Sequence, residues 1–229
     1  MPPNTDARVR LRISAVSGRV TVTAEPRADV VVERGAASHA TGDGSVEIRA
    51  GRGSDAVEVR CPAGADVIVG TRSGRVELHG RFGSVGVTSQ SGSIHAGAAE
   101  DADLRTVSGV VDVEACDGRC RVSTTSGRIR VGTTGDADIS TVSGSVGIDE
   151  VAGAAQVRSV SGKVTLGSAA RGAVHVRTVS GSITIRLPAG VRPNVRFSGR
   201  GSVRSGFEPG DDVHIDVANV SGAVQLVPS

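Results

Sequence analysis

The sequence predicts an all-β fold, a parallel β-solenoid whose coils contain about 18 residues. The first observation is a recurring Ser-Gly pair, whose successive glycines are 17 to 19 residues apart: Gly74, Gly92, Gly109, Gly127, Gly144, Gly162, Gly181 and Gly199. The second is that residues counted from each glycine fall into columns of one chemical type. The third is composition, because 32 glycines and an aromatic content of 1% favour thin stacked layers over one thick core.

The chain enters this fold through strands with one polar face. Val9, Leu11 and Ile13 alternate with arginines, and the alternation resumes after a turn at Ser17-Gly18. A period of two residues is typical of half-buried strands.

The N-terminal part is expected to be an irregular form of the same array. Residues 1–7 are predicted to be disordered, and residues 8–64 to form degenerate coils. Within these coils, the polar segment 34–44 is predicted to be an exposed loop. Short apolar strands are expected after it, at 46–48 and 57–59.

The repeats are regular from residue 65 to residue 186. The seventh and fifth residues before each corner glycine are apolar, as are the second and fourth after it; around Gly144 these are Ala137, Ile139, Val146 and Ile148. An antiparallel meander would not require successive repeats to match column for column. Stacked coils do require it, because each side chain then lies about 4.8 Å from its equivalent in the next coil.

The phrase Thr-Val-Ser-Gly is interpreted as the corner of a coil. Its first position holds a hydroxyl column: Thr71, Ser89, Thr106, Thr124, Thr141, Ser159 and Thr178. A buried hydroxyl costs about 1–3 kcal/mol if unpaired, so this column is expected to bond along the array or to the corner backbone. The valine is expected to make an apolar contact at the corner.

Glycines are expected at both corners because both need a residue that tolerates positive φ. The second corner carries its own series: Gly80, Gly97, Gly118, Gly135, Gly153, Gly172 and Gly190. Residues 187–229, which contain Phe197 and Phe207, are predicted to be C-terminal coils and a cap. Residues 8–229 then form one domain.

Two segments resemble a known family. The stretch 57–78 contains a Pro62-Ala63-Gly64 turn and ends in Ser73-Gly74-Arg75-Val76-Glu77-Leu78, and Leu187-Pro188-Ala189-Gly190 echoes the turn. This order resembles the bacterial "putative adhesin" family, domain of unknown function 4097 (DUF4097), over residues 8–227. The resemblance implies a right-handed parallel β-solenoid, often found in proteins linked to the bacterial envelope, and no catalytic residues.

Composition and charge exclude several classes of function. With 26 basic and 24 acidic residues the net charge is +2, and the chain lacks aromatics for base stacking, so no nucleic acid is expected as partner. The N-terminus has no apolar signal-peptide core, and no run of about 18 apolar residues could span a membrane. A cytoplasmic protein is expected, with any envelope association made through a partner.

Cysteine and histidine do not form a recognisable site. Cys116 and Cys120 have a spacing that a metal clip could use, but no second ligand pair lies nearby, so buried apolar roles are favoured for them and for Cys61. The histidines fall in different columns: His39, His79, His95, His175 and His214. No metal, cofactor or catalytic residue is predicted.

Two carboxylates on one face are a candidate glycan site. Asp103 and Asp138 share a column two repeats apart, about 10 Å, slightly more than an inverting pair uses. Three functions therefore stay open. The favoured one is a non-enzymatic, adhesin-like scaffold for protein partners; the others are a self-associating, filament-forming solenoid and a glycan-binding or glycan-active one.

Overall fold

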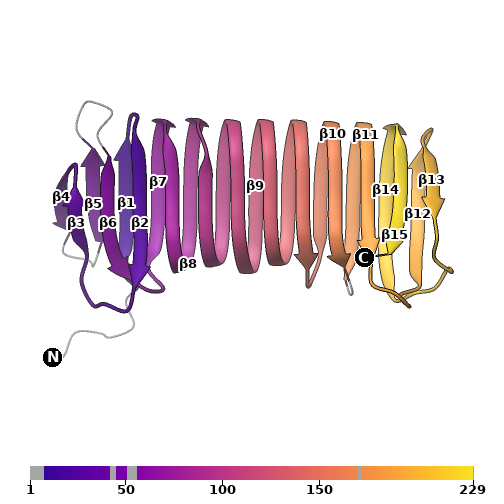
Figure 1. Cartoon of the computed structure of the whole chain (residues 1–229), viewed down its shortest axis with the longest axis horizontal. Coiled ribbons are helices and arrows are strands. Elements are labelled where there is room, and N and C mark those ends of the chain that lie inside the picture. Colours follow the sequence, from indigo (N-terminus) through magenta and orange to yellow (C-terminus); the bar gives the residue numbers. More distant parts are fainter. Residues whose placement is uncertain (1–7, 42–44, 51–55, 170–171, 229) are drawn as a thin grey trace.

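The protein is a stack of β-coils (Figure 1). The computed structural model describes residues 8–41, 45–50, 56–169 and 172–228, and within them every regular element is a strand. The predicted disorder of residues 1–7 lies outside the described residues. No helix in these segments is long and apolar enough to cross a membrane.

The central coils stack in parallel, as the column pattern predicted. Ala155 pairs with Ala137 in the preceding coil and with Val174 in the following one. The chain passes through the corners with few breaks, so several coils belong to one long strand. The elements of this region are β7 (Asp66–Ser73), β8 (Arg75–Ser91), β9 (Ile94–Val151), β10 (Ala155–Ala169) and β11 (Ala173–Leu187).

The four apolar columns form the core of the rod. In the coil around Gly144, Ala137 is 3% exposed, and Ile139, Val146 and Ile148 are no more than 2% exposed. All other residues of these columns from Val67 to Ile185 are buried as well. Small branched side chains fill most of the narrow interior. The largest fully buried side chain is that of Phe82.

Coil order in space departs from chain order at the N-terminal end. β1 lies between β5 and β7, and β2 lies between β6 and β8. The chain therefore starts one coil in from the end, builds the outermost coil and then returns to the stack. The bounds are β1 (Arg10–Ala15), β2 (Arg19–Glu25), β5 (Ser45–Ala50) and β6 (Val57–Pro62).

Two antiparallel strands cover this end of the rod. β3 (Val31–Arg34) pairs with β6, and β4 (Ala36–Thr41) pairs with β5. The prediction of a loop over residues 34–44 is therefore wrong for β4, and residues 42–44 lie outside the described chain. The reason is that polar residues are acceptable in a strand that covers an exposed sheet edge.

The C-terminal end repeats the insertion. β14 lies between β11 and β12, and β15 lies between β11 and β13, so the last strands of the chain are hydrogen-bonded on both sides. The outermost coil is made of β12 and β13. The bounds are β12 (Pro193–Gly199), β13 (Ser202–Ser205), β14 (Val213–Ser221) and β15 (Ala223–Pro228).

Gly199 does not hold the position that its spacing predicted. It pairs with Asn219, and Ser202 pairs with Ala223, so the corner of this coil is reached at Gly201, two residues later. A Cβ on Gly201 would lie 2.4 Å from the carbonyl oxygen of Gly222, the corner glycine of the neighbouring coil.

The corner glycines are required for two reasons. Gly144 has a φ of 143°, and a Cβ there would lie 1.9 Å from the carbonyl oxygen of Gly127 in the preceding coil. At the second corner the prediction of positive φ is confirmed for Gly80, Gly172 and Gly190. It is wrong for Gly97, Gly118, Gly135 and Gly153, where tight stacking supplies the reason instead: a Cβ on Gly135 would lie 2.4 Å from the Asp117 carbonyl oxygen.

Candidate interaction surface

The Thr-Val-Ser-Gly corner directs its valine outward. Thr141 is 6% exposed, whereas the following Val142 is 49% exposed. Successive residues of a strand point to opposite faces, so a buried threonine places the next side chain in solvent. The valine, expected to make an apolar contact at the corner, instead stands half-exposed on the outer face.

The outward valines form a row along the rod, here called the Val ridge. Its members are 48% to 58% exposed: Val107, Val142, Val160, Val179 and Val220. The registers of β10 with β11 and of β11 with β14 place the last three in consecutive coils. Thr125 occupies the ridge position between Val107 and Val142.

Under the ridge, the threonine and serine hydroxyls bond to the corner backbone. Thr106 donates to the carbonyl oxygen of Ser108 at 3.2 Å, and Thr178 donates to that of Ser180 at 3.3 Å. Ser89, Thr124, Thr141 and Ser159 make the equivalent bond. Of the two sequence alternatives, the bond to the corner backbone is the one found.

The ends of this hydroxyl column differ from its middle. Thr71 has a buried hydroxyl oxygen without a hydrogen-bond partner among the described residues. Asn219 replaces threonine at the other end, where its Oδ1 accepts from the backbone N–H of Ser221 at 3.1 Å.

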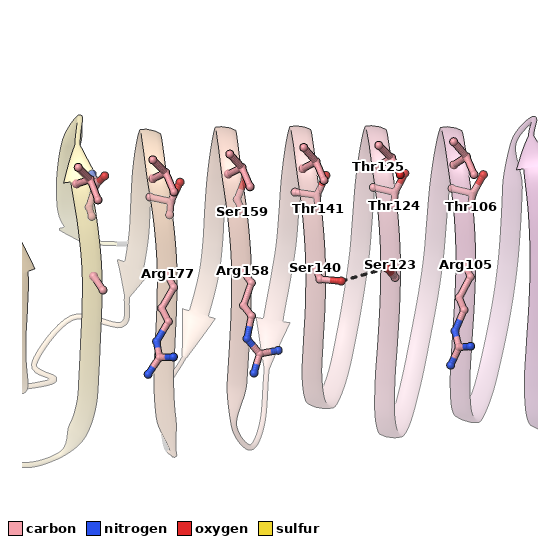
Figure 2. A pocket seen from close by; sticks show the side chains of 18 of the residues that line it. Arg105, Thr106, Ser123, Thr124, Thr125, Ser140, Thr141, Arg158, Ser159 and Arg177 are labelled. Atoms are coloured by element: carbon pink, nitrogen blue, oxygen red, sulfur yellow. Dashed lines mark hydrogen bonds between the residues drawn. The ribbon is translucent and has the colours of Figure 1, made fainter.

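A long groove runs beside the Val ridge. It has a volume of about 810 Å³ and extends from Thr88 to Ser198 across the central and C-terminal coils. The ridge forms one wall, and the threonine and serine column forms the floor. Figure 2 shows the other wall, a row of arginine and serine side chains: Arg105, Ser123, Ser140, Arg158 and Arg177.

In the middle of this wall, two short serine side chains stand where the neighbouring coils have arginines, so the wall is lower there. Ser140 donates from its hydroxyl to that of Ser123 at 3.1 Å, so the small side chains lie along the wall (Figure 2). Arg105 and Arg158 stand on either side of them. Each arginine also contacts a carboxylate further from the ridge, Asp103 at 2.9 Å and Asp138 at 3.4 Å.

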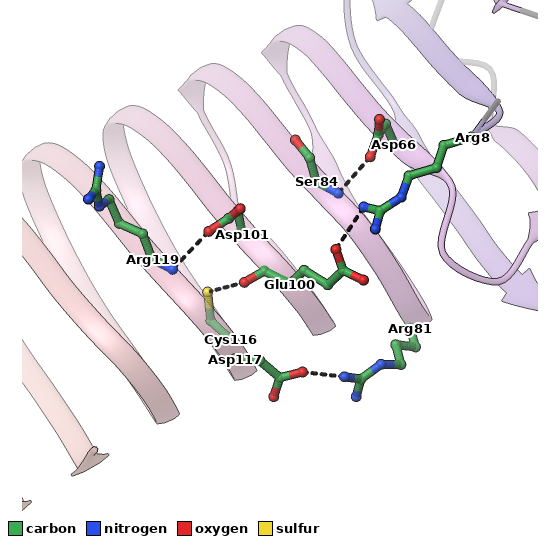
Figure 3. A network of polar contacts seen from close by, with 9 residues as sticks. All are labelled: Arg8, Asp66, Arg81, Ser84, Glu100, Asp101, Cys116, Asp117 and Arg119. Carbon is green, nitrogen blue, oxygen red and sulfur yellow. Dashed lines mark hydrogen bonds and ion pairs between the residues drawn. The ribbon is translucent and has the colours of Figure 1, made fainter. Parts of the chain in front are cut away.

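The second corner has a different chemistry. There, Asp66, Asp101 and Asp136 each accept a hydrogen bond from a backbone N–H of the next coil, at 2.8 to 2.9 Å. Figure 3 shows two of these bonds together with the ion pairs Arg8–Glu100 and Arg81–Asp117. The carboxylates at this corner hold coils together.

The cysteines are buried, as favoured from the sequence. Burial raises the pKa of the Cys61 thiol to about 11. Cys116 and Cys120 are hydrogen-bonded to each other, and this bond together with burial raises the pKa of Cys120. Cys116 also donates to the carbonyl oxygen of Glu100 at 3.6 Å (Figure 3).

The structure brings together two histidines that the column pattern kept apart. The rings of His79 and His95 are 6.0 Å apart, and His95 contacts Asp112 at 3.6 Å and Glu114 at 3.2 Å. Across the described chain, no three His, Cys, Asp or Glu side chains are placed to hold a metal ion.

The remaining histidines are isolated from one another. His175 contacts Asp216 at 3.2 Å, and His214 is exposed. For His39 only the backbone, within β4, is described.

The carboxylates weighed for glycan chemistry are both engaged by arginines. Asp103 binds Arg105 at 2.9 Å, and Asp138 contacts Arg121 at 3.6 Å as well as Arg158. Asp103 lines a smaller hollow of about 620 Å³ beside the groove, whereas Asp138 does not line it. The geometry does not present them as a pair.

Comparison with known proteins places this chain in a family. A family model described as Toastrack DUF4097 matches residues 55–226. A crystal structure of a "putative adhesin" from Bacteroides fragilis is similar at 10% identity with a TM-score of 0.48, covering 96% of this chain and 93% of that one. A "putative cell adhesion protein" from Clostridium sporogenes gives 8% identity and a TM-score of 0.30, with coverages of 97% and 93%. Comparison with curated proteins gives no match.

Proposed function

Since the chain belongs to the Toastrack DUF4097 family, we propose that it is a non-enzymatic β-solenoid scaffold whose Val ridge and adjoining groove bind a protein partner. The rod is then a right-handed solenoid with coils of about 18 residues, as the family resemblance and the residue columns imply.

The observation that carries this proposal is the Val ridge itself. Single exposed valines are common on protein surfaces, but a continuous apolar row bordered by polar residues marks an interaction site. Here four half-exposed valines, Val142, Val160, Val179 and Val220, stand in consecutive coils along one edge of a groove of about 810 Å³, and Val107 lies beyond Thr125 on the same edge. Continuous parallel ladders hold the underlying coils in register, so the chain by itself already presents this surface.

End-to-end polymerisation is a weaker reading of the same rod. Solenoids stack into filaments through unpaired parallel edges at both ends, and here β3 and β4 pair antiparallel with the outermost N-terminal coil. Catalysis on glycans is also weaker, because Asp103 lines a hollow that Asp138 does not line, so the two acids do not share one site. Protein binding needs neither an open end nor a free acid.

The test is a comparison of variants in the cells that naturally make the protein. Val142, Val160 and Val179 are replaced together by threonine, which keeps the β-branched shape. The control replaces Thr165 and Thr184, outward residues three positions after their corner glycines, by valine. Proteins that co-purify with the rod are then quantified: the ridge variant should lose specific proteins that the control retains. Identical sets from both variants would contradict the proposal.

A further inference from the structure

We propose that the partner of the groove is an extended protein segment carrying acidic side chains about four residues apart, with apolar side chains beside them. This inference rests on the proposed function and adds the chemistry of the partner. Three features carry it: the charge of the corner, the spacing of its arginines and the hydrogen bonding of the strands beneath.

The corner that carries the Val ridge is basic. Each coil contributes a window of six residues, from four before its corner glycine to one after it, as in Arg158–Lys163. From Gly74 to Gly222 these windows contain no Asp or Glu. They contain eight cations, with Gly201 as the corner of the outermost C-terminal coil: Arg72, Arg75, Arg105, Arg128, Arg158, Lys163, Arg177 and Arg200. The near-neutral balance of the whole chain conceals this because the acids lie elsewhere.

Part of this positive charge is not neutralised within the rod. Arg105 and Arg158 contact carboxylates on the side away from the ridge. Arg128, Lys163 and Arg177 form no ion pair with any residue that the structure describes. Exposed ion pairs contribute only about 0–1 kcal/mol, so even the paired arginines can turn to an acidic ligand at little cost.

The spacing of the wall arginines sets a length scale for that ligand. Arg105 and Arg158 belong to coils three steps apart, about 14 Å at about 4.8 Å per step. An extended chain advances about 3.3 Å per residue, so carboxylates four residues apart would be about 13 Å apart and could face both arginines. Ser123 and Ser140 lie between these two arginines and are small, so they leave room for the ligand side chains that lie between its two acids.

A strand added to the sheet is not the mode of binding here. The segment Ala155–Ser159 of β10 pairs with β9 on one side and with β11 on the other, so its ladder positions are already used. A ligand in the groove therefore lies across the strands and is recognised by side chains. Val142, Val160 and Val179 contact its apolar groups, and the arginines contact its acids.

A second copy of this chain fits the ridge less well. Two ridges facing each other would bring Arg128 and Lys163 against the same cations of the other copy. An acidic segment does not meet this difficulty.

The test uses the full chain and a panel of fluorescent ten-residue peptides. Each peptide has two aspartates three, four or five positions apart on a background of valine, threonine and proline, and matched peptides carry lysine instead. Anisotropy should show tightest binding for the spacing of four, with the lysine peptides at least about tenfold weaker. Equal binding of acidic and lysine peptides, or no binding of any acidic peptide, would overturn the inference.

Variants locate the binding on the protein. Arg158→Gln with Arg177→Gln, and separately Val142→Thr with Val160→Thr, should each weaken the acidic peptide several-fold. Arg130→Gln, at an exposed cation three residues after the corner glycine Gly127, is the matched control and should change nothing. If the control weakens binding as much as the wall variant does, the site lies elsewhere and the inference fails.

Other occupants give different results. If phosphatidylserine vesicles sediment the rod, this depends on the ridge valines, and no peptide binds, then the ligand of the groove is a lipid surface and not a peptide. If the rod forms concentration-dependent dimers, and the Val142→Thr, Val160→Thr variant does not, then the ligand is a second copy of the chain. If the co-purification test succeeds while no acidic peptide binds, the inference fails and the proposed function stands; if both fail, the function falls too.

Discussion

The hydroxyl of Thr141 donates a hydrogen bond to the carbonyl oxygen of Ser143, 3.3 Å away around the same corner. This bond stays within one coil, and its repetition in the coils from Ser89 to Thr178 gives these corners the same hydrogen bond. It also fixes the side on which Val142 stands, between the two bonded residues. The device that builds the corner therefore builds the exposed ridge.

Replacing Thr141 by valine tests this corner bond. The variant keeps the shape of the side chain and removes the donor, so the free energy of unfolding should fall by about 1 kcal/mol. Thr125→Val, on the exposed ridge position, is the control and should lie within about 0.5 kcal/mol of the parent. Urea unfolding monitored by circular dichroism provides both values, and equal effects would show that the bond does not stabilise the corner.

Glycine 144 should not tolerate alanine. Its φ of 143° disfavours any side chain, and the Cβ would lie 1.9 Å from the Gly127 carbonyl oxygen, so coils must separate. A loss of about 3 kcal/mol or more is expected, measured by thermal unfolding. Gly147→Ala, three residues on, is the control because its Cβ would meet nothing closer than 3.9 Å. Similar melting temperatures for the two variants would contradict the stacking described.

Asp136 should act as a hydrogen-bond acceptor at the second corner. Its Oδ1 accepts from the Ala154 N–H at 2.8 Å, so Asp136→Ala should cost about 0.5–1.5 kcal/mol. Asp136→Asn keeps an acceptor oxygen and should recover most of this loss in the same unfolding assay. If asparagine is as damaging as alanine, charge and not this bond accounts for the effect.

Cys61 should make stability depend on alkaline pH. Burial raises the pKa of its thiol from 9.0 to about 11, so the folded state holds the proton more tightly than the unfolded state. Its contribution is then fully present below about pH 9 and is lost as pH rises through about 11. The unfolding free energy of the parent should fall relative to Cys61→Ala over this range. A difference that stays constant from pH 7 to 11 would contradict the assignment.

The regular part of the fold was predictable because stacking imposes the same requirement on every coil. Residues such as Ile139 and Val157 occupy equivalent buried positions, so column chemistry indicated both the core and the parallel register. The two ends were not predictable. The insertion of β1 beside β5 and of β14 beside β12 depends on pairing between strands far apart in sequence, and no column records it.

The candidate site was not recognised in the sequence because of how its valines were interpreted. The valine was interpreted as an apolar contact at the corner, although the alternation from Thr141 already placed Val142 on the outer face. The basic windows were visible as arginine columns before and after the corner. They indicate a basic binding surface only once Arg158 and Lys163 are known to lie on either side of one ridge.

The most direct test of the central claim is photo-crosslinking from single positions around the rod in its native cells. A photoreactive residue is placed at Val142 or Val160 on the ridge, at Thr165 beyond the corner glycine Gly162, or at Asp149 towards the second corner. A discrete protein adduct is expected from positions 142 and 160 and none from 149 and 165. Adducts from all four positions alike, or only from 149 or 165, would contradict it.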